Sequence, residues 1–154
     1  MSEVQLVDYP NVTLVTKSCT CSHSELGPTI GQLYKEIGEA NPEMAMVGAP
    51  RIYYTVWAPE SCTIQAAIPV PEDAVAGSGT VKVAYPAGTA YMSTHIGPYE
   101  GLVDAWSSLM SELSDKGLYA TGLCWDDYQT DPGVEPDSSK WRTDIYIAVD
   151  IPKI

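Results

Sequence analysis

One acidic and one amide side chain stand at matching points of two similar segments. The segments 62–70 and 141–149 each alternate apolar and polar residues, a pattern typical of a half-buried β-strand. Because successive strand residues point to opposite faces, the Ile and Val residues of each segment predict a side that faces the core. Gln65 and Asp144 then share the other side with Tyr146. A carboxylate beside aromatic rings is suited to binding an organic cation.

Further aromatic residues accompany these two positions. Tyr54 and Tyr128 correspond when the two halves of the chain are aligned, and we expect both to lie near the site. The other candidate lining residues are aromatic: Trp125, Trp141 and Tyr146. On a regular strand Trp125 and Tyr128 point to opposite faces, and we expect Tyr128 to line the site because its counterpart is also Tyr. The alternative is that Asp144 and Arg142 are ordinary exposed strand residues.

Thiols and an imidazole alternate at the end of the run 12–21, which is rich in Val and Thr and predicts a strand. Cys19, Cys21 and His23 would share one face of a continuous strand, and Cys62 is a candidate fourth ligand for zinc. The spacing is not a standard zinc motif, so we expect reduced cysteines and no metal.

Acidic residues gather after the second helical segment. They are Asp126, Asp127, Asp131, Glu135 and Asp137. The spacing is not that of a calcium loop, and a proline and a glycine interrupt it. We expect a solvated loop here.

The elements that position these residues occur twice. In each half, a Gly-Pro pair is followed by one apolar stripe with helical spacing. The first stripe is Ile30, Leu33, Tyr34 and Ile37, and the second is Leu102, Ala105, Trp106, Leu109 and Leu113. Each half has the order strand, helix, strand, strand. The predicted fold is α+β, an antiparallel sheet with pseudo-twofold symmetry and both helices on one face. We expect one domain over 1–154, with modules of about 1–70 and 80–154 joined by a Pro- and Gly-rich linker, 71–79.

Charge and composition exclude several classes of function. The 154 residues include 20 acidic and 8 basic side chains, which gives a net charge of −12. Such a charge disfavours binding to nucleic acid or to an anionic membrane. The first residues do not resemble a signal peptide, no long apolar run predicts a membrane span, and we expect a cytoplasmic protein without a cofactor.

The second half contains four stretches that occur in a known order: Tyr85–Gly88, His95–Gly101, Tyr128–Pro132 and Trp141–Ile145. These stretches resemble the GyrI-like small-molecule-binding domain, the effector-binding module of multidrug-sensing MerR- and AraC-type regulators. The first half is similar to the family more weakly, through Gly48–Pro50 and Ile68–Val70. The resemblance implies a stand-alone binding protein for hydrophobic or cationic aromatic compounds, with an aromatic-lined ligand groove at the junction of the two modules.

The same resemblance leaves alternatives open. Family members often carry Glu at the positions of Asp144 and Gln65, so this sequence departs at both. Some stand-alone relatives hydrolyse strained, cyclopropane-containing electrophiles, and by resemblance Asp144 would activate water while Tyr128 donates a hydrogen bond. A further alternative is an interaction protein that inhibits DNA gyrase. The oligomeric expectation is a monomer or weak homodimer.

Overall fold

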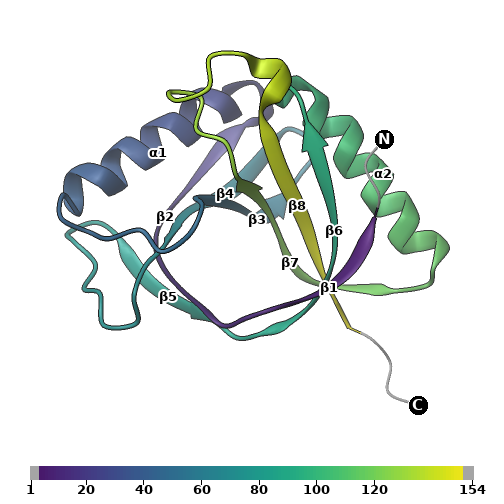
Figure 1. The fold of residues 1–154 in the computed structure, drawn as a ribbon, viewed down its shortest axis with the longest axis horizontal. Coiled ribbons are helices and arrows are strands. Elements are labelled where there is room, and N and C mark those ends of the chain that lie inside the picture. Colours follow the sequence, from purple (N-terminus) through teal and green to yellow (C-terminus); the bar gives the residue numbers. More distant parts are fainter. Residues whose placement is uncertain (1–3, 151–154) are drawn as a thin grey trace. The chain divides into compact units, whose positions relative to one another are not determined.

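A computed structural model describes residues 4–150, so both ends of the expected 1–154 domain lie outside the described residues. Figure 1 shows the helices and strands along the chain. The strands are β1 (Gln5–Tyr9), β2 (Val12–Ser22), β3 (Arg51–Trp57), β4 (Ser61–Pro69), β5 (Val81–Tyr85), β6 (Gly88–Ile96), β7 (Tyr119–Tyr128) and β8 (Arg142–Asp150). The α-helices are α1 (Leu26–Ala40) and α2 (Leu102–Asp115), and short 3-10 helices η1 (His23–Glu25), η2 (Tyr99–Gly101) and η3 (Ser138–Lys140) complete the list.

Two compact units make up the described chain. The internal unit comprises Asn11–Pro86, and the terminal unit combines the described residues up to Pro10 with those from Ala87 onward. Each unit contains one long helix and four antiparallel strands. The fold is therefore α+β and antiparallel, as the sequence predicts.

In the internal unit the strand order is β3-β4-β2-β5, and α1 packs on β2 and β4. The predicted stripe of α1 is confirmed, because Leu33 and Ile37 are buried. Lys17 shows which face of the sheet meets the helix, since its Nζ lies 3.2 Å from Glu36 of α1. Lys17 stands directly opposite Ala66, so the even-numbered residues of β4 face α1.

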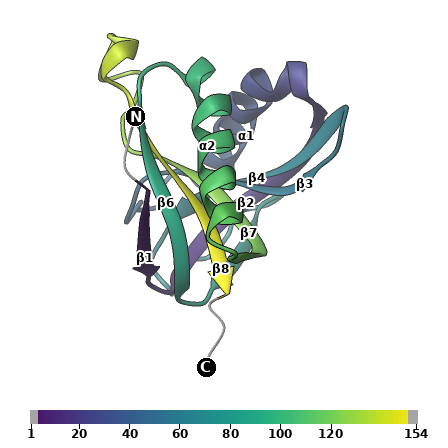
Figure 2. The same ribbon diagram turned by 90° about the vertical axis from the view of Figure 1, so that its right-hand side faces the viewer.

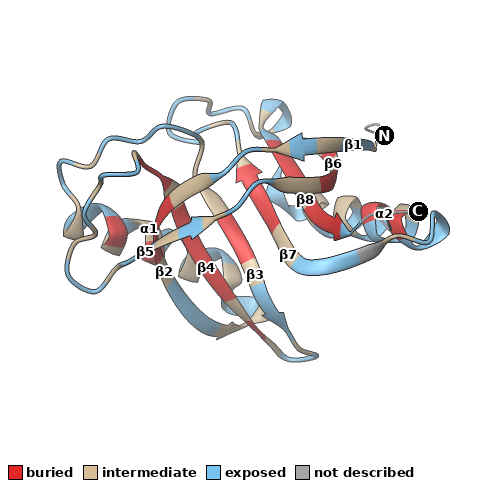
Figure 3. Ribbon diagram, turned by 90° about the horizontal axis from the view of Figure 1, so that it is seen from below, coloured by how far each residue is buried: buried red, intermediate tan, exposed pale blue. Residues whose placement is uncertain are grey.

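In the terminal unit the strand order is β1-β6-β8-β7, and α2 lies along β6 and β8 (Figure 2). Its core joins Leu109 and Leu113 of α2 to alternate residues of β8, namely Ile145, Ile147 and Val149. This confirms the predicted core-facing side of the last strand. Figure 3 shows the same concentration of buried residues in β4 of the internal unit and β8 of the terminal unit.

The repeated order strand, helix, strand, strand is confirmed as β2-α1-β3-β4 and β6-α2-β7-β8. One strand joins each unit from outside its repeat. These are β1, which was not predicted and pairs with β6, and β5, which pairs back to β2. The units therefore differ from the expected 1–70 and 80–154 division: the first strand belongs with the second half, and β5 belongs with the first.

The second helix ends at a glycine in the left-handed conformation. Gly117 has a φ of 65°, a conformation that costs glycine little because it lacks a Cβ. Its N–H donates to Ser114 O at 3.1 Å, and Leu118 N–H donates to Leu113 O at 3.2 Å. These two bonds satisfy the last carbonyl groups of α2.

The expected linker 71–79 forms no helix or strand, but it is attached to the end of α1. Asn41 Oδ1 accepts from Gly77 N–H at 2.6 Å, and Asn41 Nδ2 donates to Ile37 O at 2.8 Å. A Cβ on Gly77 would collide with the carbonyl oxygen of Ala40. Only glycine allows the loop to approach the helix so closely. Among the described residues, neither helix is long and apolar enough to cross a membrane.

Candidate functional site

The Asp144 carboxylate is buried on the face of the terminal sheet that points away from α2. Only 3% of the residue is exposed. Its Oδ1 accepts from Thr94 Oγ1 at 2.7 Å and from Arg142 Nε at 3.0 Å. Its Oδ2 accepts from Arg142 Nη2 at 3.2 Å. The Arg142 side chain is 52% exposed, so the guanidinium lies between the buried carboxylate and water.

These bonds define the electrostatics of the site. The hydrogen bonds to Asp144 and its negative charge raise the pKa of Arg142, an effect that partial burial of the guanidinium opposes. Two parallel N–H···O bonds from one guanidinium form the strongest common pairing of a carboxylate. Asp144 is thus a buried, ion-paired residue, and the alternative that it is an ordinary exposed strand residue is wrong, whereas Arg142 is exposed as that alternative expects.

A second carboxylate lies directly across the ladder. Asp127 of β7 is paired in register with Asp144, so both side chains point to the same face, and Asp127 is 8% exposed. Asp126, one residue earlier, points to the helix side, is fully buried, and accepts from Trp106 Nε1 at 2.7 Å. The expectation of a solvated acidic loop is therefore wrong for these two residues, which belong to a strand. Asp131 and Asp137 are exposed in the loop after it.

Aromatic rings cover the same face beside the carboxylates. Trp125 pairs in register with Tyr146, and their rings stack at 4.8 Å between centroids with planes 10° apart. Tyr9 of β1 meets Trp125 edge-on at 5.2 Å, and burial raises the pKa of its hydroxyl. Trp125 is only 1% exposed. The structure thus brings together three of the expected residues, Trp125, Tyr146 and Asp144.

Tyr128 and Trp141 lie elsewhere in the terminal unit. Tyr128 pairs with Thr143, so it points to the helix side, and its hydroxyl donates to Asp126 Oδ2 at 3.2 Å. The Tyr99 ring contacts Tyr128 edge-on at 5.5 Å and Trp141 at 4.9 Å. The preference for Tyr128 over Trp125 as the residue beside Asp144 is therefore wrong, because the register of β7 and β8 places it on the opposite face.

The indole N–H of Trp141 is also occupied, since it donates to Glu135 O at 2.7 Å. The ring thereby holds the irregular segment before β8. Burial and the negative charge of Asp131 raise the pKa of the neighbouring Tyr99. Trp141 and Tyr99 form a packed corner at the start of β8, separate from the Trp125 and Tyr146 stack.

In the internal unit, Gln65 occupies the corresponding place on the face away from α1. Its Oε1 accepts from Tyr85 OH at 2.7 Å, and its Nε2 lies 3.5 Å from Thr16 Oγ1. Tyr53 stands directly opposite Gln65, its ring 5.0 Å from that of Tyr85, and its hydroxyl accepts from Arg51 Nη1 at 2.8 Å. The amide thus belongs to a hydrogen-bonded polar and aromatic cluster.

Tyr54 is the second tyrosine that the structure places away from its expected partner. It pairs with Ile64, so it points to the helix side of the internal sheet, where it contacts Trp57 edge-on at 5.8 Å. The residue beside Gln65 is Tyr53. In both halves the aligned tyrosines, Tyr54 and Tyr128, share a face with the helix rather than with the polar residue.

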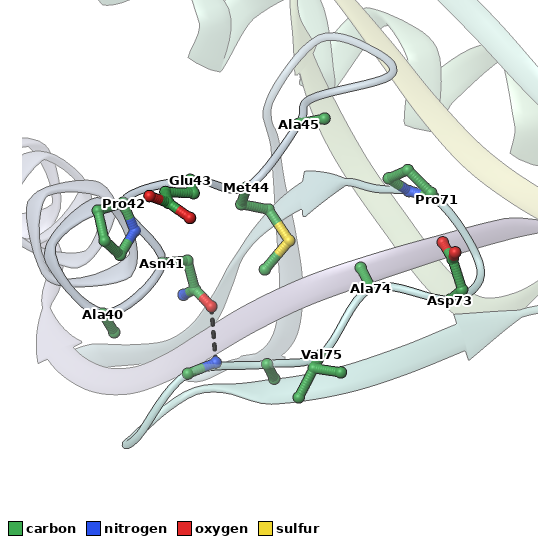
Figure 4. Close-up of a pocket in the computed structure, with 12 residues that line it drawn as sticks. Ala40, Asn41, Pro42, Glu43, Met44, Ala45, Pro71, Asp73, Ala74 and Val75 are labelled. Carbon is green, nitrogen blue, oxygen red and sulfur yellow. Dashed lines mark hydrogen bonds between the residues drawn. The ribbon is translucent and has the colours of Figure 1, made fainter.

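A hollow on the internal unit was not expected from the sequence. It has a volume of about 490 Å³ and lies between the end of α1 and the 71–79 segment (Figure 4). Alanine and proline side chains line much of it, with Met44 and Val75, and two carboxylates, Glu43 and Asp73, at its wall. None of the expected site residues contributes to it.

Two site residues, Asp127 and Thr94, were not predicted from the sequence, because only the pairing of the strands identifies them. Asp127 and Thr94 are assigned to the site because each stands directly opposite Asp144 on a neighbouring strand. The alternation of apolar and polar residues identifies the faces of one strand, but it does not state which residue of the next strand lies alongside.

Comparison with known proteins adds the family. The model of the GyrI-like small molecule binding domain matches residues 2–150. No curated protein matches the chain. The EcmrR C-terminal domain has a TM-score of 0.82 at 22% identity, over 99% of each chain. In an EcmrR–DNA complex the TM-score is 0.86 at 21% identity, and this chain spans 58% of the length of that one.

Two further structures share the fold at lower identity. SAV2435 bound to tetraphenylphosphonium has a TM-score of 0.74 at 12% identity, over 96% of this chain and 94% of that one. A hydrolase encoded by lin2189 from Listeria innocua has a TM-score of 0.65 at 10% identity, over 96% and 92%. A match that covers nearly the whole chain, together with the repeated strand-helix-strand-strand order, shows that the chain belongs to the family of GyrI-like small molecule binding domains.

Proposed function

We propose that the chain binds a hydrophobic, cationic aromatic compound on the face of the terminal unit that carries Trp125, Tyr146 and Asp144. The stacked indole and phenol rings beside a buried carboxylate are the observation that supports this proposal. Aromatic faces attract organic cations, and ligand sites combine apolar walls with a few placed polar groups. A drug-bound relative, SAV2435 with tetraphenylphosphonium, supports the same ligand class.

Arg142 marks the position of the ligand's positive charge in this proposal. Its guanidinium is paired with the Asp144 carboxylate. Because the Arg142 side chain is 52% exposed, the guanidinium can turn toward water at a small cost in free energy. A ligand cation then replaces it on the carboxylate and gains contact with the aromatic rings. Binding of a cation is therefore an exchange of one positive group for another, with Thr94 holding Asp144 Oδ1 in place throughout.

Titration with tetraphenylphosphonium, followed by tryptophan fluorescence and calorimetry, tests the proposal. Asp144→Asn removes the charge but keeps the shape, and we expect about tenfold weaker binding, or about 1.4 kcal/mol. Arg142→Ala removes the competing cation and is expected to strengthen binding severalfold. A neutral compound of the same size, triphenylphosphine oxide, is expected to bind the wild-type protein more weakly than the cation.

Tyr128→Phe is the matched control for these variants. It removes a hydroxyl from the same strand as Trp125, but on the opposite face, and is expected to leave the affinity unchanged. Equal binding of the cation by wild-type protein and Asp144→Asn, or equal binding of the neutral compound, would contradict a carboxylate-assisted site. Weaker binding by Arg142→Ala would contradict the exchange.

Binding is favoured over hydrolysis by the positions of the two residues that hydrolysis was expected to use. Both oxygens of Asp144 already accept hydrogen bonds from Thr94 or Arg142, so a water molecule would have to compete with these donors. Tyr128 lies on the other face and cannot act with it. We expect no turnover of an activated cyclopropane substrate, measured by chromatography. Turnover that Asp144→Asn abolishes would favour hydrolysis instead.

A further inference from the structure

Two thiols face each other across neighbouring strands of the internal unit. Cys21 of β2 and Cys62 of β4 are directly opposite in the antiparallel register. Opposed residues of such a ladder have Cα atoms about 4.5 or 5.5 Å apart. Both separations fall within the range of about 4.4–6.8 Å that a disulfide requires. The Cα separation of this pair is therefore compatible with a disulfide.

The two thiols differ in accessibility. Cys62 is 1% exposed, whereas Cys21 is partly exposed. Burial, and then the neighbouring Cys21, raises the pKa of the Cys62 thiol to about 11. A reagent in solution therefore meets Cys21 first, and Cys62 is the neighbour that reacts with whatever forms there.

The other candidate metal ligands have different neighbours. The His23 ring lies in η1 rather than on the strand, stacks on Trp57 at 4.3 Å, and its Nε2 lies 3.1 Å from Ser61 O. Cys19 is exposed and stands opposite Ile64. Within residues 4–150, no three His, Cys, Asp or Glu side chains are grouped to hold a metal ion. The feature that remains is the opposed pair of thiols.

We propose that Cys21 and Cys62 form a redox-active pair that a small disulfide oxidant, such as oxidised glutathione, converts to a cross-strand disulfide. The Cys21 thiolate attacks one glutathione sulfur and releases the first glutathione as a thiolate. The Cys62 thiol then gives its proton to the released glutathione thiolate, and its sulfur attacks Cys21 Sγ and expels the second glutathione as a thiolate, which takes up the proton that Cys21 had lost. Two protein thiols are oxidised and one glutathione disulfide is reduced to two glutathione molecules, so atoms and electrons balance.

The new bond would close a loop that contains the whole of α1 and β3. Closing a loop of this kind restricts the unfolded chain, so the oxidised protein should unfold at a higher urea concentration than the reduced protein. The bond lies within the internal unit and uses no residue of the proposed ligand site.

The test uses the full chain, incubated with oxidised glutathione and analysed by intact mass and by non-reducing peptide mapping. We expect the protein to lose two hydrogen atoms and the map to contain a peptide pair joined through Cys21 and Cys62. Cys19→Ser should still form this bond, whereas Cys21→Ser and Cys62→Ser should not. The urea midpoint should rise on oxidation in wild-type protein and in Cys19→Ser only.

Three results would overturn the proposal. The first is glutathione retained on Cys21 or Cys19 without a cross-link. The second is a cross-link that forms only in urea, which would show that the folded chain does not bring the thiols together. The third is a joined pair that involves Cys19 or Cys124 instead. Because Cys19→Ser keeps both thiols of the pair, misfolding of the other two variants does not prevent a decision.

Discussion

Removing Arg142 should destabilise the protein more than neutralising Asp144, although Arg142 is the more exposed partner. Arg142→Ala leaves a carboxylate that is 3% exposed with one remaining hydrogen bond, from Thr94. Asp144→Asn leaves an amide of the same shape that can still accept from Thr94, while Arg142 returns to water. The two changes break the same ion pair but leave different groups behind.

The magnitudes follow from burial. Two charges about 4 Å apart attract by about 4 kcal/mol at an effective dielectric constant of about 20, which is a gross value. Solvent screening at the half-exposed Arg142 reduces the net value, so we expect Asp144→Asn to cost about 1 kcal/mol. An unpaired buried charge costs about 3–5 kcal/mol, and because water can enter where Arg142 was, we expect about 2 kcal/mol for Arg142→Ala.

Urea unfolding of the single and double variants measures these values. Combining Arg142→Ala with Asp144→Asn should restore about 1 kcal/mol relative to Arg142→Ala alone, since the stranded charge is gone. Lys17 and Glu36 form the control pair, because both side chains are about one-third exposed and either single substitution should cost about 0.5 kcal/mol. A double variant less stable than Arg142→Ala, or a larger loss for Asp144→Asn, would refute the reasoning.

Three further predictions concern packing and pH. Leu109→Ala removes a fully buried side chain from the core of the terminal unit and should cost about 3 kcal/mol of unfolding free energy, measured in urea. Gly77→Ala places a Cβ against the carbonyl of Ala40 and should cost about 1–3 kcal/mol, whereas Gly31→Ala, with open space around it, should stabilise by up to about 1 kcal/mol; equal effects would contradict the close approach. The pKa of Cys62 is about 11 in the folded state against 9.0 for the free group, so its contribution to stability is present below about pH 9 and is lost as the pH rises toward 11. Cys62→Val should therefore show a smaller fall in urea midpoint over that interval than the wild-type protein, and an identical fall would contradict it.

The fold could be predicted from local patterns to a considerable extent. The stripe around Leu33 and Ile37 and the stripe around Leu109 and Leu113 both form helices that bury those residues. The alternation in β8 places Ile145 on the core side, as predicted. These patterns are local, because helix and strand periodicity depends only on neighbouring residues in the chain.

Strand pairing could not be predicted in the same way. Nothing in Gln5–Tyr9 states that it pairs with β6, and β5 resembles the start of the second half although it pairs with β2. Pairing depends on which edges are free after the sheet has assembled, so it is a property of the whole fold rather than of a segment.

The sequence by itself determined the two repeats, the two helices, the apolar side of β8 and the position of Asp144 on the opposite side. The tertiary structure decided what Asp144 meets: Arg142 along its own strand, Thr94 and Asp127 across the ladder, and the Trp125 and Tyr146 stack beside it. A shift of one residue in register would exchange Trp125 for a neighbour on the other face, because strand side chains alternate with a period of two. The observed register pairs Tyr128 with Thr143, so Tyr128 lies on the helix side with Asp126, although the sequence favoured it as a residue of the ligand site.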